Sequence, residues 1–259
     1  MKDVQSLKDS RQLAINKVGI KSLRYPITVL DKYNKQQHTV AEINMYVDLP
    51  EDNKGTHMSR FVEILNEYHD KLTMGNMVEV LSVMKTKLEA AKARMEINFT
   101  YFIKKIAPIS KSEGMMDYQC SFIGECSEDK GEFILKAEVP ITSLCPCSKE
   151  ISQYGAHNQR SILTIEAKYT DFLWLEDLID VAENSGSCQL YPLLKRVDEK
   201  YVTEYAYDHP AFAEDIVRNA ASQLLENKNI TWFRVQVENL ESIHNHSAYA
   251  CIEKEIIQK

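Results

Sequence analysis

The order in which two hydrophobic periodicities follow one another constrains the fold of this chain more than any other feature. Apolar residues that alternate with polar ones predict β-strands, whereas apolar residues at every third or fourth position predict amphipathic helices. In the first half, two strand patterns precede two helical patterns, and two further strand patterns follow. In chain order these six patterns lie at residues 18–30, 41–47, 61–68, 77–91, 97–103 and 118–123.

The second half repeats this order of elements without repeating the residues. Its six patterns lie at residues 133–141, 163–169, 175–182, 211–226, 233–237 and 248–252. Clustered strands with an inserted helix pair predict an α+β fold with antiparallel sheets, because a parallel sheet would need strands and helices in strict alternation. We therefore expect two tandem β-β-α-α-β-β units, at residues 1–126 and 127–259, with their boundary near the charged turn at 127–131.

Composition excludes several classes of protein. The longest apolar run, near Phe172–Leu175, is far shorter than the roughly 20 residues of a membrane-spanning helix. The net charge of −7 argues against a general nucleic-acid binder, which would carry a basic excess. The start of the chain has no apolar segment typical of a secretory signal, and the six cysteines are sparse and irregular. These features predict a reducing, cytoplasmic setting.

The most informative stretch for chemistry is Thr142–Arg160, between two predicted strands. Cys145 and Cys147 flank a proline, and His157 follows the first cysteine by twelve residues. A thiolate and an imidazole are common ligands of divalent metals. With no complete set of four Cys and His ligands, the pattern favours an open catalytic site over a closed structural one. The alternative is a pair of loop cysteines beside a surface histidine.

Three further stretches carry candidate residues. Glu241, His244 and His246 lie between the last two predicted strands. They are candidates for metal ligands or proton carriers, and the alternative is that they belong to a solvated polar hairpin. The charged run 193–204 offers Glu199 or Asp198 as a ligand, with Lys195 and Arg196 for phosphates, unless it is only a solvated linker. His57, Ser59 and Arg60 begin a predicted helix, where backbone N–H groups favour anions. Glu214 also begins a helix, where an ordinary interaction with the helix dipole is the simpler role.

Seven blocks of sequence together resemble GTP cyclohydrolase type IB. They cover most of the chain from about residue 18 and keep the order found in that family. The blocks are Gly55–Arg60 (GTHMSR), Leu144–Glu150 (LCPCSKE), Gly155–Arg160 (GAHNQR), Leu194–Glu199 (LKRVDE), Val202–Tyr207 (VTEYAY), Phe212–Asp215 (FAED) and Glu241–His246 (ESIHNH). Val197 stands where the family often has proline, and none of the departures touches a titratable group.

The resemblance implies the tunnelling fold, in a homotetramer whose active sites lie at subunit interfaces. It also implies hydrolysis of GTP to 7,8-dihydroneopterin triphosphate and formate, the first step of tetrahydrofolate or pterin synthesis. The matching metal ligands are Cys145, His157 and Glu199, for manganese, zinc or possibly iron, with no nicotinamide or flavin. The matching catalytic residues are Cys147, Glu241, His244 and, less directly, His246.

The resemblance also implies which residues contact the substrate. Glu214 matches the glutamate that anchors guanine, because one carboxylate accepts two N–H bonds from the guanine edge. The remaining substrate-binding candidates are basic or polar side chains: His57, Ser59, Arg60, Lys149, Arg160, Lys195 and Arg196. No membrane or nucleic-acid partner is expected.

Three other functions are compatible with parts of the pattern. A tunnelling-fold nitrile reductase of 7-deazaguanine synthesis would use a loop cysteine and NADPH, but it needs no metal and no set of histidines. An archaeal-type cyclohydrolase would give a cyclic phosphate product. A zinc-stabilised interaction module without turnover would unfold when its metal is removed.

Overall fold

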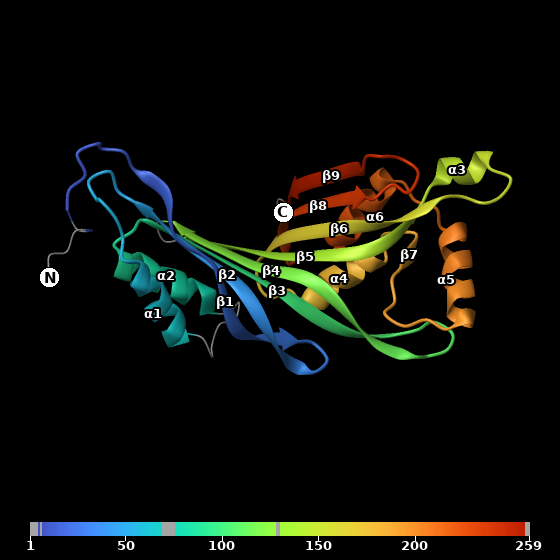
Figure 1. Ribbon diagram of the computed structural model, residues 1–259, viewed down its shortest axis with the longest axis horizontal. Helices are drawn as coiled ribbons and strands as arrows, with labels where there is room; N and C mark the ends of the chain where they lie inside the picture. The colour runs from blue at the N-terminus through green and yellow to red at the C-terminus, as the bar shows by residue number, and fades with distance from the viewer. Residues whose placement is uncertain (1–4, 6, 69–75, 128–129, 257–259) are drawn as a thin grey trace. The chain divides into compact units, whose positions relative to one another are not determined.

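The computed structural model of the chain describes residue 5 and residues 7–68, 76–127 and 130–256. Its strands are β1 (Ile15–Asp31), β2 (Lys35–Leu49), β3 (Lys92–Ile106), β4 (Glu113–Ser127), β5 (Lys130–Leu144), β6 (Asn158–Tyr169), β7 (Cys188–Gln189), β8 (Ile230–Asn239) and β9 (Ala248–Glu255) (Figure 1). Its helices are α1 (Met58–Tyr68), α2 (Met77–Leu88), α3 (Pro146–Ile151), α4 (Leu175–Glu183), α5 (Arg196–Asp208) and α6 (Ala213–Glu226). Within these ranges no helix is both long and apolar enough to span a bilayer.

The sheet follows the predicted topology. Among the described residues, the strands form one sheet in the order β1-β2-β3-β4-β5-β6-β8-β9, and β7 pairs with β5. The pairings β1–β2, β2–β3, β5–β6, β6–β8 and β8–β9 are all antiparallel. The predicted α+β class is thus confirmed. The first half has the expected two strands, two helices and two strands, and the second half keeps this order with α3, β7 and α5 added.

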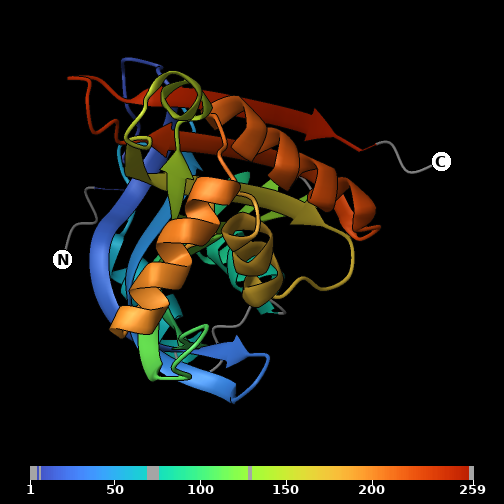
Figure 2. The same ribbon diagram turned by 90° about the vertical axis from the view of Figure 1, so that its right-hand side faces the viewer.

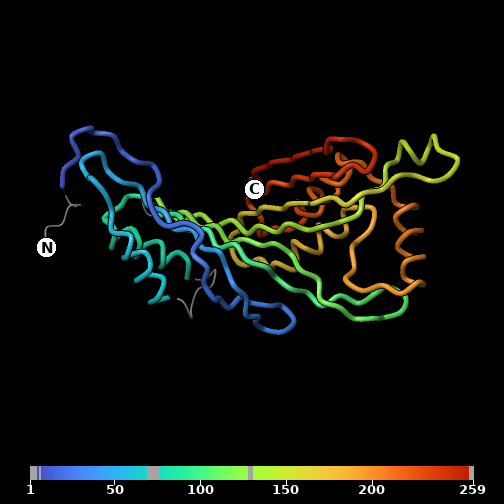
Figure 3. The backbone as a smooth tube through the Cα atoms, viewed as in Figure 1, coloured from blue at the N-terminus to red at the C-terminus, as the bar shows by residue number. Residues whose placement is uncertain are grey.

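The chain divides into two compact units. The first comprises residues 1–100 and 121–134, and the second comprises residues 101–120 and 135–259. The long strands β3, β4 and β5, which can be followed in Figure 3, each contribute residues to both units. The boundary predicted between residues 126 and 127 adjoins residues 128–129, which lie outside the described residues, and it stays a prediction.

The core of the first unit lies between its two helices and the strands. Phe61 and Ile64 of α1 and Leu81 of α2 are fully buried, together with Ile43 and Met45 of β2. The helices pack on each other, α1 contacts β1, and α2 contacts β2. The apolar faces predicted from helical spacing are therefore the faces that are buried.

The core of the second unit lies under α4 and α6. In Figure 2, α6 runs beneath β8 and β9, and the contacts place α4 against β6 and α6. Ile216 and Ala220 of α6 and Ile179 of α4 are buried, and so are strand residues such as Ile165 and Val235. This packing fixes the first turn of α6, which carries Glu214, relative to the sheet.

A buried ionic cluster ties α4 to three strands of the second unit. Glu183, at the end of α4, accepts hydrogen bonds on Oε1 from Lys105 Nζ of β3 at 2.6 Å and from Tyr118 Oη of β4 at 2.5 Å. Lys105 Nζ also donates to Gln189 Oε1 of β7 at 3.1 Å. Because a buried charge is costly unless paired and hydrogen-bonded, these contacts are what make Lys105 and Glu183 compatible with the interior.

Helix α5 was not among the predicted helices. Its dense charges are typical of a solvated linker, yet residues 196–208 are helical. Among its side chains only Asp198 and Ala206 are buried, so α5 lacks the apolar stripe on which a periodicity argument depends. A buried carboxylate attaches this helix instead.

Candidate functional site

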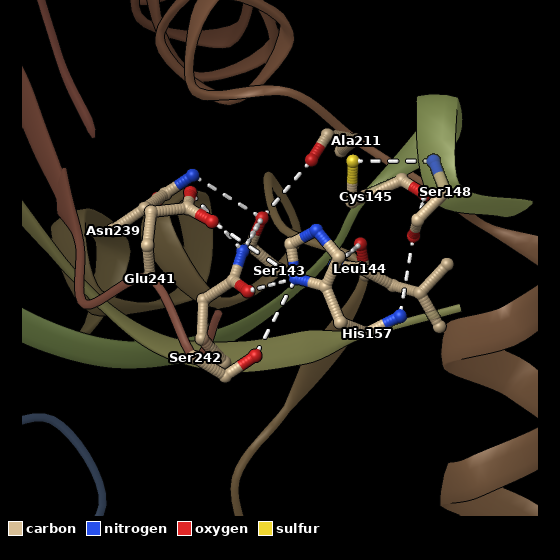
Figure 4. A network of polar contacts seen from close by, with 11 residues as sticks. Ser143, Leu144, Cys145, Ser148, His157, Ala211, Asn239, Glu241 and Ser242 are labelled. Atoms are coloured by element: carbon tan, nitrogen blue, oxygen red, sulfur yellow. Dashed lines mark hydrogen bonds and ion pairs between the residues drawn. The ribbon is translucent and has the colours of Figure 1, made fainter. Parts of the chain in front are cut away.

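The loop between β5 and β6 brings Cys145 next to His157. Cys145 is the N-cap of α3 and Pro146, which has no N–H to satisfy, follows it. The backbone N–H of Cys145 donates to the His157 carbonyl at 3.1 Å, and the His157 N–H donates to Ser148 Oγ at 3.2 Å. Two residues predicted to bind one metal are thus adjacent where the loop closes (Figure 4).

The Cys145 side chain lies at the start of α3. Its Sγ accepts the Ser148 backbone N–H at 3.4 Å. The side chain is partly exposed, as a metal ligand near a substrate must be. Cys147, at the second position of α3, is exposed, and no hydrogen bond of its side chain occurs among the described residues.

His157 is held on one ring nitrogen only. Its Nδ1 lies 2.9 Å from Gln159 Oε1, 3.4 Å from Ser242 Oγ and 3.9 Å from Glu241 Oε2. The Gln159 Nε2 group donates to Ser143 Oγ at 3.3 Å and to Glu241 Oε1 at 3.5 Å. Because the amide nitrogen of Gln159 faces these acceptors, the amide oxygen of Gln159 faces the His157 ring. Nδ1 then carries the proton, and within the described chain Nε2 has no hydrogen-bond partner. This is the arrangement typical of a metal-ligating histidine.

Glu241 follows β8 and points toward His157, as Figure 4 shows, and its side chain is only 12% exposed. His244 and His246 lie further along the same turn, both exposed, with ring centroids 5.1 Å apart. Neither forms a hydrogen bond or ion pair with Cys145 or His157 in the described part of the chain. Of the three candidates in this turn, the structure brings only Glu241 to the site.

The network also leaves one buried acceptor unused. Asn239, the last residue of β8, donates from Nδ2 to Ser143 Oγ at 3.3 Å, and Ser143 Oγ donates to the Ala211 carbonyl at 3.0 Å. Asn239 Oδ1 is buried, and no described residue donates to it.

Glu199 is exposed in the first turn of α5, and the structure does not bring it to Cys145 and His157. Among the described residues, no group of three or more His, Cys, Asp or Glu side chains is close enough to hold a metal. The thiol and the free imidazole nitrogen fit a divalent metal, so one chain supplies part of a donor set. Asp198, the alternative ligand, is fully buried with both carboxylate oxygens hydrogen-bonded to backbone N–H groups, and it is not available.

Glu214 keeps an unused carboxylate at the start of α6. The helix cap is provided by Asp215, whose Oδ2 accepts the Phe212 N–H at 3.0 Å. Glu214 is exposed, and its side chain has no hydrogen bond or ion pair among the described residues. The Ala211 N–H donates to the Leu144 carbonyl at 3.0 Å, so α6 begins beside the strand end that carries Cys145.

The basic candidates fall into different settings. Arg160 of β6 lines a cavity of about 620 Å³, a size typical of small-molecule sites, together with Thr142, Asn158 and Thr203. Asn158 and Thr203 also line a second cavity of about 420 Å³. Helix α5, which carries Thr203, therefore forms a wall of both.

The other basic side chains lie at helix ends. Lys149 Nζ donates to the Tyr207 carbonyl at 2.5 Å and lies over the Tyr207 ring. Lys195 and Arg196 are exposed where α5 begins.

The candidates of the first unit lie where α1 begins. The Arg60 backbone N–H donates to the His57 carbonyl at 3.1 Å, and Arg60 Nη1 donates to the Lys87 carbonyl of α2 at 2.8 Å. Ser59 is exposed within the first turn. Part of the Arg60 side chain therefore links the two helices.

Sequence reasoning missed the residues that support the site. Gln159, Ser143, Asn239 and Ser242 connect His157 to Glu241 and to the start of α6. Gln159 lies inside a block that carries the family resemblance, two residues after His157, and this spacing in an extended segment was the available signal.

Comparison with solved structures gives the fold. A uricase from Bacillus fastidious superposes with a TM-score of 0.57 at 8% identity, covering 92% of this chain and 93% of that chain. At this identity the likeness concerns the fold alone. The fold is the predicted tunnelling fold, here with Cys145 joined to His157 by a backbone hydrogen bond and with the His157 ring facing Glu241 after β8.

Comparison of sequences gives the family. A family model described as type I GTP cyclohydrolase folE2 matches residues 1–250. GTP cyclohydrolase FolE2 of Geotalea uraniireducens (strain Rf4) is 56% identical over 259 residues, 100% of this chain and 95% of that protein. GTP cyclohydrolase FolE2 of Geobacter sp. (strain M21) is 55% identical over 254 residues, 98% of this chain and 95% of that protein. The chain belongs to the type I GTP cyclohydrolase FolE2 family, as the seven blocks predicted.

Proposed function

We propose that this protein hydrolyses GTP to 7,8-dihydroneopterin triphosphate and formate. The observation that carries the proposal is the placement of His157, which is joined to Cys145 through their backbones while its Nδ1 is held by Gln159 and faces Glu241. The family relationship supports GTP as the substrate. The rival functions, a nitrile reductase and a non-catalytic zinc module, lack this support.

A divalent metal would be held by Cys145 Sγ, His157 Nε2 and the Glu199 carboxylate. When bound, such a metal lowers the pKa of water so that a nucleophile for C8 of guanine forms near neutral pH. The mixed sulfur, nitrogen and oxygen set accepts manganese, zinc or iron. The Glu199 side chain is exposed and has no hydrogen bond or ion pair among the described residues, which is compatible with a ligand role, and assembly at a subunit interface would explain why one chain does not complete the set.

The chain's own residues supply the proton transfers. Opening of the imidazole ring breaks one of the two C8–N bonds and release of formate breaks the other, so N7 and N9 must each gain a proton, and later ring closure requires further transfers. Glu241 is the best placed carrier, because its carboxylate faces His157 and Gln159 in a largely enclosed position. We assign additional transfers to His244 and, less directly, His246. The exposed thiol of Cys147 stays available for a separate catalytic role.

Recognition of the substrate is divided between the base and the triphosphate. Glu214 would accept two N–H bonds from the guanine edge, and its carboxylate is free to do so because Asp215 caps the helix. Arg160, in the wall of the larger cavity, would bind the triphosphate together with basic side chains of the interface. We assign those contacts to His57, Ser59, Arg60, Lys149, Lys195 and Arg196, within a homotetramer in the cytoplasm that serves pterin or folate synthesis.

The proposal is tested by incubating the purified protein with GTP and Mn²⁺ and analysing the product by mass and by pterin fluorescence after oxidation. We expect a neopterin triphosphate that is absent without metal. A cyclic phosphate would indicate the archaeal-type reaction. NADPH oxidation with a 7-deazaguanine nitrile, and no turnover of GTP, would contradict the proposal.

A further inference from the structure

Asp198 joins the first turn of α5 to the turn between β3 and β4. Its side chain is 0% exposed. Oδ1 accepts the backbone N–H groups of Ile109 at 2.9 Å and Ser110 at 2.8 Å, and Oδ2 accepts the Lys195 N–H at 2.9 Å. One carboxylate thus satisfies three backbone donors from two segments that lie far apart in sequence.

The β3–β4 turn is itself well ordered, so it can act as an anchor. The Ala107 N–H donates to the Ser112 carbonyl at 2.8 Å, and the Ser110 and Ser112 hydroxyls lie 3.0 Å apart. In Figure 2 this green turn lies against one end of α5, drawn in orange. The anchor is therefore a closed turn.

Few other contacts hold this end of the helix. Ala206, two turns further along, is the only other buried side chain of α5. Exposed residues share the first turn with Asp198, among them Glu199, whose carboxylate is the candidate third ligand. Thr203 of the same helix lines both cavities. The position of a functional side chain and of a cavity wall thus depends on one buried carboxylate.

We propose that Asp198 is a positioning residue, which acts through α5 to hold Glu199 where it can bind the metal. This inference rests on the proposed function, because it takes Glu199 as a ligand. The alternative is that Asp198 is only a local helix cap. Asp215 provides the comparison: it accepts the N–H of its own N-cap residue, Phe212, in the same way, and among the described residues no hydrogen bond or ion pair joins it to another element.

The test compares Asp198→Asn with Asp215→Asn. An amide at position 198 presents N–H groups to one of the two sets of backbone donors, so one attachment is lost. We expect faster amide exchange in residues 107–112 and 196–204 of Asp198→Asn only. We also expect its Mn²⁺ affinity, measured by titration of the metal alone, to fall about 10- to 100-fold, as for other residues that orient ligands. Asp215→Asn should keep the wild-type affinity.

A double variant tests whether Asp198 acts through Glu199. Glu199→Ala is expected to lose its metal during purification but to bind Mn²⁺ weakly in titration through Cys145 and His157, and Asp198→Asn in this background should lower that weak affinity no further, because the effect needs the Glu199 carboxylate. Unchanged amide exchange, or faster exchange with unchanged affinity, would overturn the positioning role. Wild-type protein that binds no Mn²⁺ would overturn the proposed metal site and the role of Glu199 with it, and exchange alone would then decide whether Asp198 attaches α5.

Should Asp198→Asn fail to fold, Ser110→Pro removes one of the three donors from outside α5. The same two measurements apply to it. Faster exchange over 196–204 with weaker Mn²⁺ binding supports the proposal, and wild-type values of both contradict it.

Discussion

Gln159 Oε1 lies 2.9 Å from His157 Nδ1, and the same amide group donates to Ser143 and Glu241 from its nitrogen. Because the amide nitrogen is committed to acceptors, its oxygen faces the ring and requires a proton on Nδ1. The neutral imidazole then presents a lone pair on Nε2, which is the form that binds metal.

Replacing Gln159 should therefore weaken metal binding without removing a ligand. We expect Gln159→Leu to lower the Mn²⁺ affinity about 10- to 100-fold, since the ring loses the acceptor that fixes its tautomer. Gln236→Leu is the matched control, because Gln236 of β8 accepts from the Tyr249 hydroxyl and does not contact His157. Equal affinities in the two variants, measured by metal titration, would refute this role of Gln159.

The two cysteines of the loop should separate metal binding from turnover. Cys145→Ala, His157→Ala and Glu199→Ala are each expected to lose metal and activity while staying folded, because each removes a ligand. Cys147→Ala should keep its metal and lose most turnover, since its exposed thiol accepts no bond that positions a ligand. Elemental analysis of the purified variants decides: a full metal complement in the first three variants would contradict the ligand set.

Glu214 and Asp215 should separate base recognition from helix capping. Glu214→Gln should barely change the melting temperature, but it should lower kcat/KM for GTP about ten- to more than a hundredfold, because a charge-assisted bond to guanine is worth roughly 1.5–3 kcal/mol. Asp215→Asn keeps an oxygen for the Phe212 N–H but loses the negative charge in the first turn of α6, so we expect a loss of about 0.3–1 kcal/mol of stability with nearly unchanged kcat/KM. Similar thermal shifts with unchanged kcat/KM in both variants would remove Glu214 from the site.

The buried pair in the second unit makes a prediction about stability. Lys105→Ala would leave Glu183 buried without its counter-charge, at an expected cost of roughly 3–5 kcal/mol in the free energy of unfolding. The exposed pair Lys200–Glu204, with side chains 71% and 60% exposed, provides the control. Lys200→Ala should cost at most about 0.5 kcal/mol. Urea denaturation that gives equal losses for the two variants would show that burial does not set the cost.

Much of the fold could be predicted from sequence because the strands and most helices bury one regular face. The patterns at 61–68 and 211–226 match α1 and α6, where Ile64 and Ile216 are fully buried. Helix α5 could not be found in this way, because its first turn is attached through Asp198 and presents no apolar stripe. The spacing of apolar residues therefore cannot distinguish a charged, solvated linker from a helix that is attached through a buried carboxylate.

The candidate site could be predicted in its residue types and only partly in its arrangement. Cys145 and His157 lie at the two ends of a loop that connects two predicted strands. If these strands pair, the loop brings the two residues together, so their proximity could be expected from the sequence. The contact of His157 with Glu241 depends on the pairing of β6 with β8, across 84 residues of chain, which no local pattern encodes. The place of Glu199 depends on α5, the helix that the sequence did not reveal.

The central claim is that C8 of GTP leaves as formate, and labelled substrate tests it most directly. The protein would be loaded with Mn²⁺ and incubated with GTP carrying ¹³C at C8, and the products would be followed by ¹³C NMR. We expect the label to appear in formate in equal amount to the dihydroneopterin triphosphate formed, with none left in the pterin. Label that stays in intact GTP, or in a purine or pterin product without formate, would contradict it.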